Sequence, residues 1–208
     1  MVSYRQRAGL QIIRDEHASI AAMLHAMKQM LRRGPDNAPE RFFDVMRAML
    51  FYIDEFPEKR HHRKESEVLF PKLARSAPET IDVIRALEAE HHSGHDRVRE
   101  LQHLLLAWEF LGDSRRQAFE DAATKYVAFY LNHMKIEETQ LLPVAARCLT
   151  KADLAHLDVV FRENPDPLAG QADQAEDEES DEARDAMYDR LFSLIVLRAP
   201  APVGVGPD

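Results

Sequence analysis

Two His-x-x-x-Glu pairs and one His-x-x-x-His pair stand out in the sequence. They are His61/Glu65, His133/Glu137 and His91/His95. Residues four apart lie one above the other on a helix face, so the two side chains of a pair can reach one point. Imidazole and carboxylate groups together are a ligand set that suits iron, manganese or zinc. A single pair is weak evidence, because in a chain with 10 histidines chance alone gives about one His-x-x-x-Glu pair.

The distribution of these pairs is more informative than any one of them. Each pair falls in a different predicted helix, and His17, in the run Asp15-Glu16-His17, lies in a fourth. The intervals from His17 to His61, from His61 to His91 and from His91 to His133 are 44, 30 and 42 residues. Each interval is about one helix and its turn, so the four elements can meet at one level.

Five histidines and two glutamates in the interior of a bundle would be costly to bury without a partner. Seven ligands are too many for one ion. The spacing therefore predicts two metal ions bridged by carboxylates. His62 and His92 point about 100° away from their neighbours, so we expect them behind the ligands or at the surface. A rotation of the helix after Pro57 is the alternative that would bring His62 inward.

Apolar residues recur at three-and-four spacing through most of the chain, which indicates amphipathic helices. Glycine and proline mark their ends, and Phe56-Pro57 is expected to kink or break the second. The predicted class is all-α: an up-down-up-down antiparallel four-helix bundle with an extra C-terminal helix. The predicted bundle helices span residues 9–32, 39–74, 78–111 and 114–149.

The character of the sequence changes after Thr150, so we divide the chain into a bundle of residues 1–150 and an extension of residues 151–208. The extension begins with a predicted short helix at 151–162 and contains an acidic run at 173–185, expected to be a linker. An amphipathic helix at 183–198 follows. Its apolar face requires a surface, either its own bundle or a partner subunit in a homodimer.

Composition excludes several classes of function. The formal net charge is −9, most of it in the acidic run, and no part of the chain offers the basic surface that nucleic acid demands. The single cysteine, Cys148, rules out an internal disulfide and a cysteine-ligated metal cluster. No long apolar stretch indicates a signal peptide or membrane span, and we expect a cytoplasmic protein.

Four motifs, "DEH", "HHRKESEVLFP", "EHHSGH" and "HMKIEETQLLP", together resemble the hemerythrin-like (HHE cation-binding) family over roughly residues 8–149. The resemblance implies a four-helix bundle with two iron ions, oxo- or hydroxo-bridged, for which zinc or manganese can substitute. Carried over by position, it implies one iron on His91, His95 and His133 and the other on His17 and His61. Glu65 and Glu137 would bridge the two ions.

The same resemblance implies a small diatomic ligand or peroxide as the partner, bound at the iron that has fewer histidines. Oxygen-carrying members have His-x-x-x-x-Asp in the fourth helix, whereas this chain has His133-x-x-x-Glu137. That departure weakens the case for reversible oxygen carriage. Three hypotheses remain: a protein that binds or senses oxygen, nitric oxide, peroxide or iron; a di-iron enzyme that consumes peroxide or nitric oxide; and a helical interaction module without metal.

Overall fold

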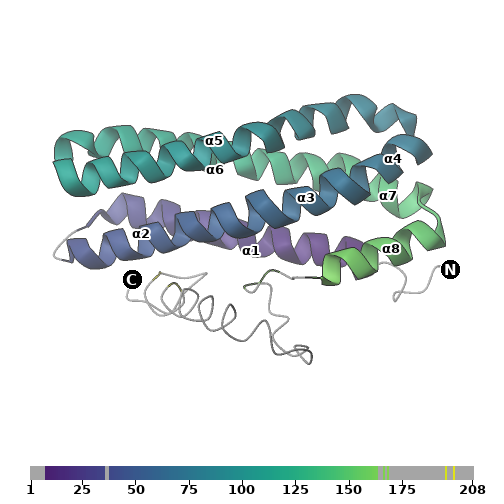
Figure 1. The fold of residues 1–208 in the computed structure, drawn as a ribbon, viewed down its shortest axis with the longest axis horizontal. Coiled ribbons are helices and arrows are strands. Elements are labelled where there is room, and N and C mark those ends of the chain that lie inside the picture. The colour runs from purple at the N-terminus through teal and green to yellow at the C-terminus, as the bar shows by residue number, and fades with distance from the viewer. Residues whose placement is uncertain are drawn as a thin grey trace.

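The computed structural model describes residues 8–35 and 38–163, together with Asp166, Leu168, Ile195 and Ala199. Every regular element in this part of the chain is helical, which confirms the all-α class. Four long helical rods lie side by side (Figure 1), and a fifth, shorter helix packs against the first. The architecture is a helical bundle.

The first rod is α1 (Ala8–Arg33), and the third is α5 (Ile81–Leu111). The second and fourth rods each change helical type along their length. The second consists of α2 (Pro39–Ile53), a π-helical stretch (Asp54–His61), α3 (His62–Lys64), a second π-helical stretch (Glu65–Leu69) and α4 (Phe70–Ser76). The fourth consists of α6 (Arg116–Ile136), a π-helical stretch (Glu137–Leu141) and α7 (Leu142–Cys148).

Short connections join consecutive rods. Gly34 has a φ of 72° and Gly112 a φ of 84°, in the left-handed region that glycine adopts without steric cost. Single 3-10 turns, Pro78–Thr80 and Asp113–Arg115, lead into the third and fourth rods. Each rod contacts two others, α1 with α2 and α6, and α5 with α2 and α6. The rods therefore form a closed ring around one interior.

Of the kink or break expected at Pro57, the break is absent. The second rod passes through this residue in the π-helical stretch Asp54–His61. A π turn is wider than an α turn, and such widenings commonly accommodate a residue that cannot donate a backbone hydrogen bond. Pro71 and Pro143 likewise stand in the first turn of α4 and α7, each directly after a π-helical stretch.

The predicted short helix after Thr150 is present as α8 (Lys151–Arg162). Thr150 and Asp153 form a capping box, in which each side chain accepts a hydrogen bond from the other's backbone N–H. Helix α8 packs on α1, and the backbone of Leu157 and Asp158 approaches so closely that a Cβ at Gly9 would overlap it. The first helix of the extension is thus packed tightly on the bundle.

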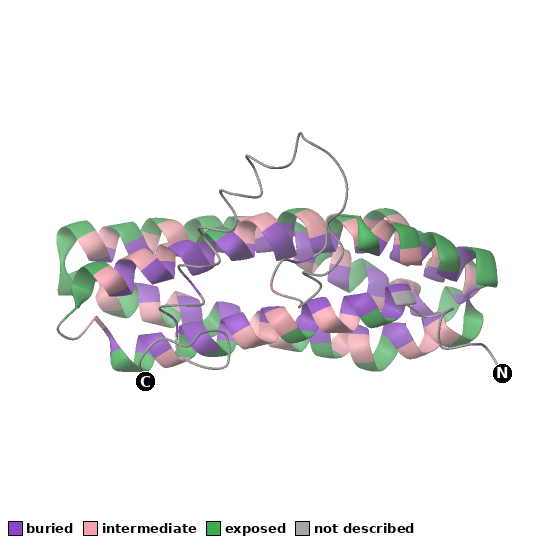
Figure 2. Cartoon of the chain, turned by 90° about the horizontal axis from the view of Figure 1, so that it is seen from below, coloured by how far each residue is buried: buried purple, intermediate pink, exposed green. Residues whose placement is uncertain are grey.

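Buried residues follow the inward faces of the rods (Figure 2). The apolar core consists of two clusters, and a band of polar side chains lies between them. On α1, Ile13 belongs to one cluster and Ile20 to the other, and the buried His17 stands between them. The four rods therefore hold a polar layer in the middle of an apolar interior.

Two predicted features of the extension lie outside the described residues: the acidic run 173–185 and most of the helix 183–198. Ile195 and Ala199 are described, and both are buried in the apolar cluster that contains Ile20. None of the helices that the structure describes is long and apolar enough to cross a bilayer. The division at residue 150 stays a prediction.

Candidate metal centre

Two buried glutamates occupy the middle of the polar layer. Glu65 begins the second π-helical stretch of the second rod and has no exposed surface. Its Oε1 lies 3.3 Å from His61 Nε2, and its Oε2 lies 3.6 Å from His91 Nε2. The two oxygens of this carboxylate therefore face histidines on two different rods.

Glu137 begins the π-helical stretch of the fourth rod and is equally buried. Its Oε2 lies 3.2 Å from His17 Nε2, and its Oε1 lies 3.2 Å from His133 Nε2. Each glutamate thus directs one oxygen toward the pair His17/His61 and the other toward His91 and His133. This is the arrangement that two bridging carboxylates require.

The histidines form two pairs through their inner nitrogens. His17 Nε2 and His61 Nε2 lie 3.1 Å apart, and His91 Nε2 and His133 Nε2 are separated by the same distance. We call the first pair with both glutamates position 1, and the second pair with both glutamates position 2. In each position the candidate ligand atoms lie within 4.8 Å of one another.

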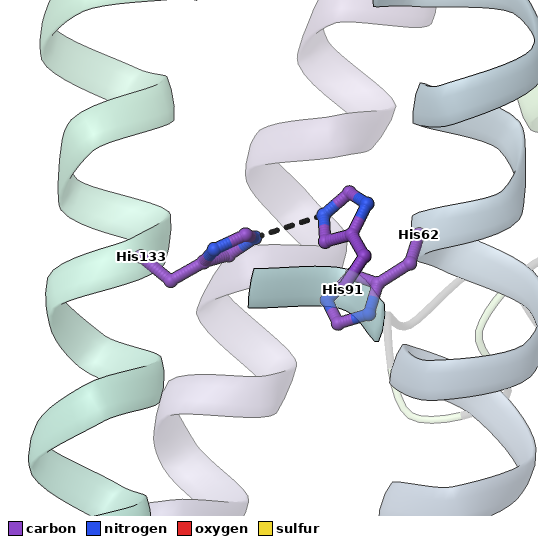
Figure 3. Close-up of side chains that lie close together, drawn as sticks. All are labelled: His62, His91 and His133. Carbon is purple, nitrogen blue, oxygen red and sulfur yellow. Dashed lines mark hydrogen bonds between the residues drawn. The ribbon is translucent and has the colours of Figure 1, made fainter. Parts of the chain in front are cut away.

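A fifth histidine lies beside position 2. His62 is buried, and its ligand atom lies within 4.8 Å of those of His91 and His133. Figure 3 shows the three imidazoles together, contributed by three different rods. The ring of His62 stacks on that of His91, with centroids 3.9 Å apart and planes 12° apart. Its Nε2 lies 2.6 Å from the Tyr130 hydroxyl.

Four of these histidines also have an oxygen atom beside Nδ1. For His17, His61 and His133 the oxygen belongs to a carboxylate, which accepts a hydrogen bond from Nδ1–H and leaves Nε2 facing inward. Each rod supplies the outer partner of a histidine on the next rod, all the way round the ring of four rods. Glu16 Oε2 lies 2.7 Å from His61, Ser66 Oγ 2.9 Å from His91, Glu90 Oε2 2.7 Å from His133, and Glu138 Oε1 3.1 Å from His17.

Glu58 lies beside the second ring nitrogen of His62. Its Oε2 lies 3.3 Å from His62 Nδ1, and its Oε1 accepts a hydrogen bond from the Tyr126 hydroxyl at 2.8 Å. The buried carboxylate fits only because α5 has a glycine opposite, since a Cβ at Gly94 would overlap it. Burial raises the pKa of Glu58 to about 7.

The buried carboxylates fit a metal better than they fit the protein alone. All four oxygens of Glu65 and Glu137 lack a hydrogen-bond partner in the described part of the chain, although such groups normally have one. Burial and the charge of Glu137 raise the pKa of Glu65, which reflects the repulsion between two anions in one layer. A cation between them would satisfy these oxygens and remove the repulsion.

The pKa values of the histidines indicate where positive charge is favoured. Burial lowers the pKa of His133, but Glu137, Glu65 and Glu90 raise it overall to about 9. Burial also lowers the pKa of His61, but Glu65 and Glu16 raise it overall to well above its usual value. A divalent cation would supply this charge instead and displace the protons, so metal binding should release protons.

The chain was compared with families of known proteins. The model of the hemerythrin HHE cation-binding domain matches residues 8–145. The chain belongs to the hemerythrin HHE cation-binding domain family. No curated protein and no solved structure matches it significantly. Membership implies that the domain binds metal cations, typically iron, and the histidine and glutamate cluster is where this hemerythrin-like domain can hold them.

Six of the seven ligands expected from the sequence come together in this hemerythrin-like domain, and one does not. The seven were His17, His61, Glu65, His91, His95, His133 and Glu137. His95 belongs to neither metal position. Its side chain is 44% exposed, and its Nδ1 lies 3.8 Å from Asp54 Oδ1. His95 lies one helical turn beyond His91. It is next to Gly94, which contacts Glu58, and not next to the bridging candidates Glu65 and Glu137. The assignment of ligands itself stays a prediction.

His62, rather than His95, lies beside His91 and His133. The angle of about 100° between His61 and His62 suggested that only one of them faced inward. The second rod, however, touches both α1 and α5, so the bundle interior extends over a wide sector in front of it. His61 points to His17 on α1, and His62 points to His91 on α5, which accounts for the burial of both.

Sequence reasoning also missed the outer partners. Each of the four stands directly beside a candidate ligand in the sequence but contacts a histidine of another rod. Two consecutive residues of a helix face two different neighbouring helices. A polar residue next to a predicted ligand therefore indicated a possible contact with a histidine of another rod. These polar residues are Glu16 beside His17, Ser66 beside Glu65, Glu90 beside His91 and Glu138 beside Glu137.

Proposed function

We propose that this hemerythrin-like domain binds two iron ions and uses them to bind or sense a small ligand: oxygen, nitric oxide or peroxide. The observation that carries the proposal is the orientation of Glu65 and Glu137, each of which directs one oxygen to each position. Iron matches the mixed imidazole and carboxylate donors and is the cation typical of the family. Zinc and manganese fit the same donors and are substitutes to be tested.

The two positions differ in their number of protein ligands, which supports a site for the small ligand. Position 1 has His17 and His61 and shares both glutamates, and we assign His62 to position 2 because it lies beside His91 and His133. An iron in position 1 would therefore retain an open coordination site, and when bound it supplies redox chemistry there. The chain's own contribution is to orient the imidazoles and to enclose the layer between two apolar clusters.

A second candidate function is an enzyme that consumes peroxide or nitric oxide. Reduction of peroxide to water requires protons as well as electrons, and groups that can carry protons lie beside His62. Tyr130 contacts His62, and Tyr126 donates to Glu58, which lies beside the same histidine. These contacts are the observation in favour of the second candidate, and they lie beside position 2 rather than position 1. The third hypothesis, an interaction module without metal, leaves the unpaired carboxylates without an explanation.

Anaerobic titration of metal-free protein with Fe²⁺ tests the proposal, and elemental analysis gives the stoichiometry. We expect two irons per chain for the wild type and for His95→Ala. His62→Ala should weaken the second equivalent by at least about tenfold, because it removes an imidazole from position 2. Uptake of one iron or none by the wild-type chain would refute the two-iron centre, and two unaltered equivalents in His62→Ala would refute our assignment of His62.

Addition of oxygen and of peroxide to the loaded ferrous protein separates the two functions. Reversible optical bands would favour the binder or sensor, and sustained loss of peroxide would favour the enzyme. Glu137→Asp is the informative companion, because it keeps the carboxylate of a candidate bridging residue and shortens only its side chain. Its shorter side chain should alter the bands if Glu137 bridges the ions.

We also propose that the four rods run in alternating directions, up-down-up-down. The short connections at Gly34, Ala77 and Gly112 support it, because a turn of a few residues between packed helices reverses the chain. A homodimer through the helix at 183–198 and a cytoplasmic location remain further parts of the proposal.

A further inference from the structure

Asp166 connects the segment after α8 to the interior of the bundle. Although it follows the last described helix, its side chain is only 5% exposed. Its Oδ2 accepts a hydrogen bond from the Tyr52 hydroxyl at 2.6 Å, and its Oδ1 accepts one from the backbone N–H of Leu168 at 2.9 Å. Tyr52 is fully buried in α2. Asp166 is thus anchored by its carboxylate to the second rod.

Asp166 lies beside the outer partner of a metal-ligand candidate. Asp166 and Glu16 line the same small cavity, and Glu16 is the residue that holds His61 Nδ1. Glu16 is buried and is otherwise contacted by Lys64, whose Nζ lies 3.6 Å from its Oε1. Asp166, bound to Tyr52, therefore adjoins the pair of Glu16 and His61 across this cavity.

The cavity is small, with a volume of about 10 Å³. Its walls are apolar at Ile20, Phe56 and Pro57 and polar or charged at Glu16, Arg60, His61, Lys64 and Asp166. Such a space holds about one water molecule. Asp166 limits the room next to Glu16, so loss of its anchor would admit more water and let the Glu16 carboxylate turn away from His61.

We propose that Asp166 is a positioning residue for position 1, so that a residue beyond α8 contributes to the metal centre. The inference rests on the proposed function of the site. Asp166 acts by keeping Glu16 aligned on His61 Nδ1, which keeps His61 Nε2 directed at position 1. Partners of metal-bound histidines typically change metal affinity by about 10–100-fold when they are removed.

Titration of the metal-free full-length chain with Co²⁺, followed by its visible absorption and by calorimetry, is the test. We expect Asp166→Ala to weaken one of the two equivalents by about 10-fold or more and to leave the other within about threefold. The weakened bands should be those that His17→Ala removes, since His17 belongs to position 1. Asp166→Asn should restore wild-type affinity, because an amide can still contact Tyr52 and Leu168.

Asp153→Ala is the matched control. Asp153 caps α8 and contacts Lys72 and Arg75, so this change loosens the same side of the molecule without touching Glu16. We expect its Co²⁺ affinities to be unchanged. Equal losses in Asp153→Ala and Asp166→Ala, or no loss in Asp166→Ala, would overturn the proposal.

A second measurement keeps this inference separate from the two-metal proposal. In metal-free protein, NMR can follow the exchange of the His61 Nδ1 proton with solvent. Asp166→Ala should accelerate the exchange about tenfold or more, and Asp166→Asn should not. If the wild type bound no metal while exchange accelerated as expected, the metal centre would be refuted and the role of Asp166 retained. Unchanged exchange would refute that role directly.

Discussion

Gly94 provides a direct test of how the layer behind position 2 is packed. A Cβ at this residue would overlap the Glu58 carboxylate, which is buried and bound by Tyr126. Gly94→Ala must therefore displace Glu58. Overpacking typically costs about 1–3 kcal/mol, and loss of a hydrogen bond to a charged group costs about 1.5–3 kcal/mol. Alanine in a helix recovers about 1 kcal/mol.

The expected net effect is a loss of about 2 kcal/mol in the free energy of unfolding of the metal-free chain. For a protein of this size that corresponds to a fall of about 4–8 °C in Tm. Urea unfolding followed by circular dichroism measures the free energy. Asp96→Ala, at an exposed position of the same helix, is the control and should change stability by less than about 0.5 kcal/mol.

The sign of the effect should reverse when Glu58 is shortened. In a Glu58→Ala background the space opposite Gly94 is free, so Gly94→Ala should stabilise the chain by about 1 kcal/mol through helix propensity alone. The double-mutant cycle would then give a coupling of about 3 kcal/mol between the two residues. If Gly94→Ala destabilised both backgrounds equally, the steric argument would be refuted.

Two further predictions concern Glu58 and the start of α8. Burial raises the pKa of Glu58 from an ordinary 4.5 to about 7. Between pH 4.5 and pH 7 the folded chain therefore holds a proton on Glu58 that the unfolded chain has released. Stability should therefore fall by up to about 3 kcal/mol as the pH rises from 4.5 to 7, and Glu58→Gln should remove this part of the fall in urea unfolding. Thr150→Ala breaks the capping box and should cost about 1 kcal/mol, seen as faster amide exchange in α8 but not in α5.

The fold class followed from the sequence because its signals are local and repeated. Apolar periodicity over four long segments, with glycine at the turns, predicted the rods within a few residues. The π-helical stretches were harder to foresee. Yet Glu65 and Glu137 each begin such a stretch and stand six residues before a proline, Pro71 and Pro143. Because proline lacks an N–H, the helix before it can widen at little cost, and this repeated spacing was a usable signal.

The ligand set depended on information that spacing does not contain. His91 and His95 satisfy the same four-residue rule as His61 and Glu65, but the rule places a pair on one face without fixing its level in the bundle. The level is set by packing between rods, here by the approach of Glu58 to Gly94. Glu58 therefore occupies the space beside the turn that carries His95. His62, which follows His61 in the sequence, stacks on His91 instead.

The cyclic arrangement of outer partners links the metal centre to the assembly of the bundle. Each rod both supplies a candidate ligand and holds the histidine of the next rod. Tilting one rod would therefore misalign ligands on two. The same contacts satisfy the outer nitrogens from within the protein, and an apolar cluster lies on either side of the layer. The folded chain thus presents inward-facing nitrogens and unpaired carboxylates in advance, which lowers the conformational cost of binding the ions.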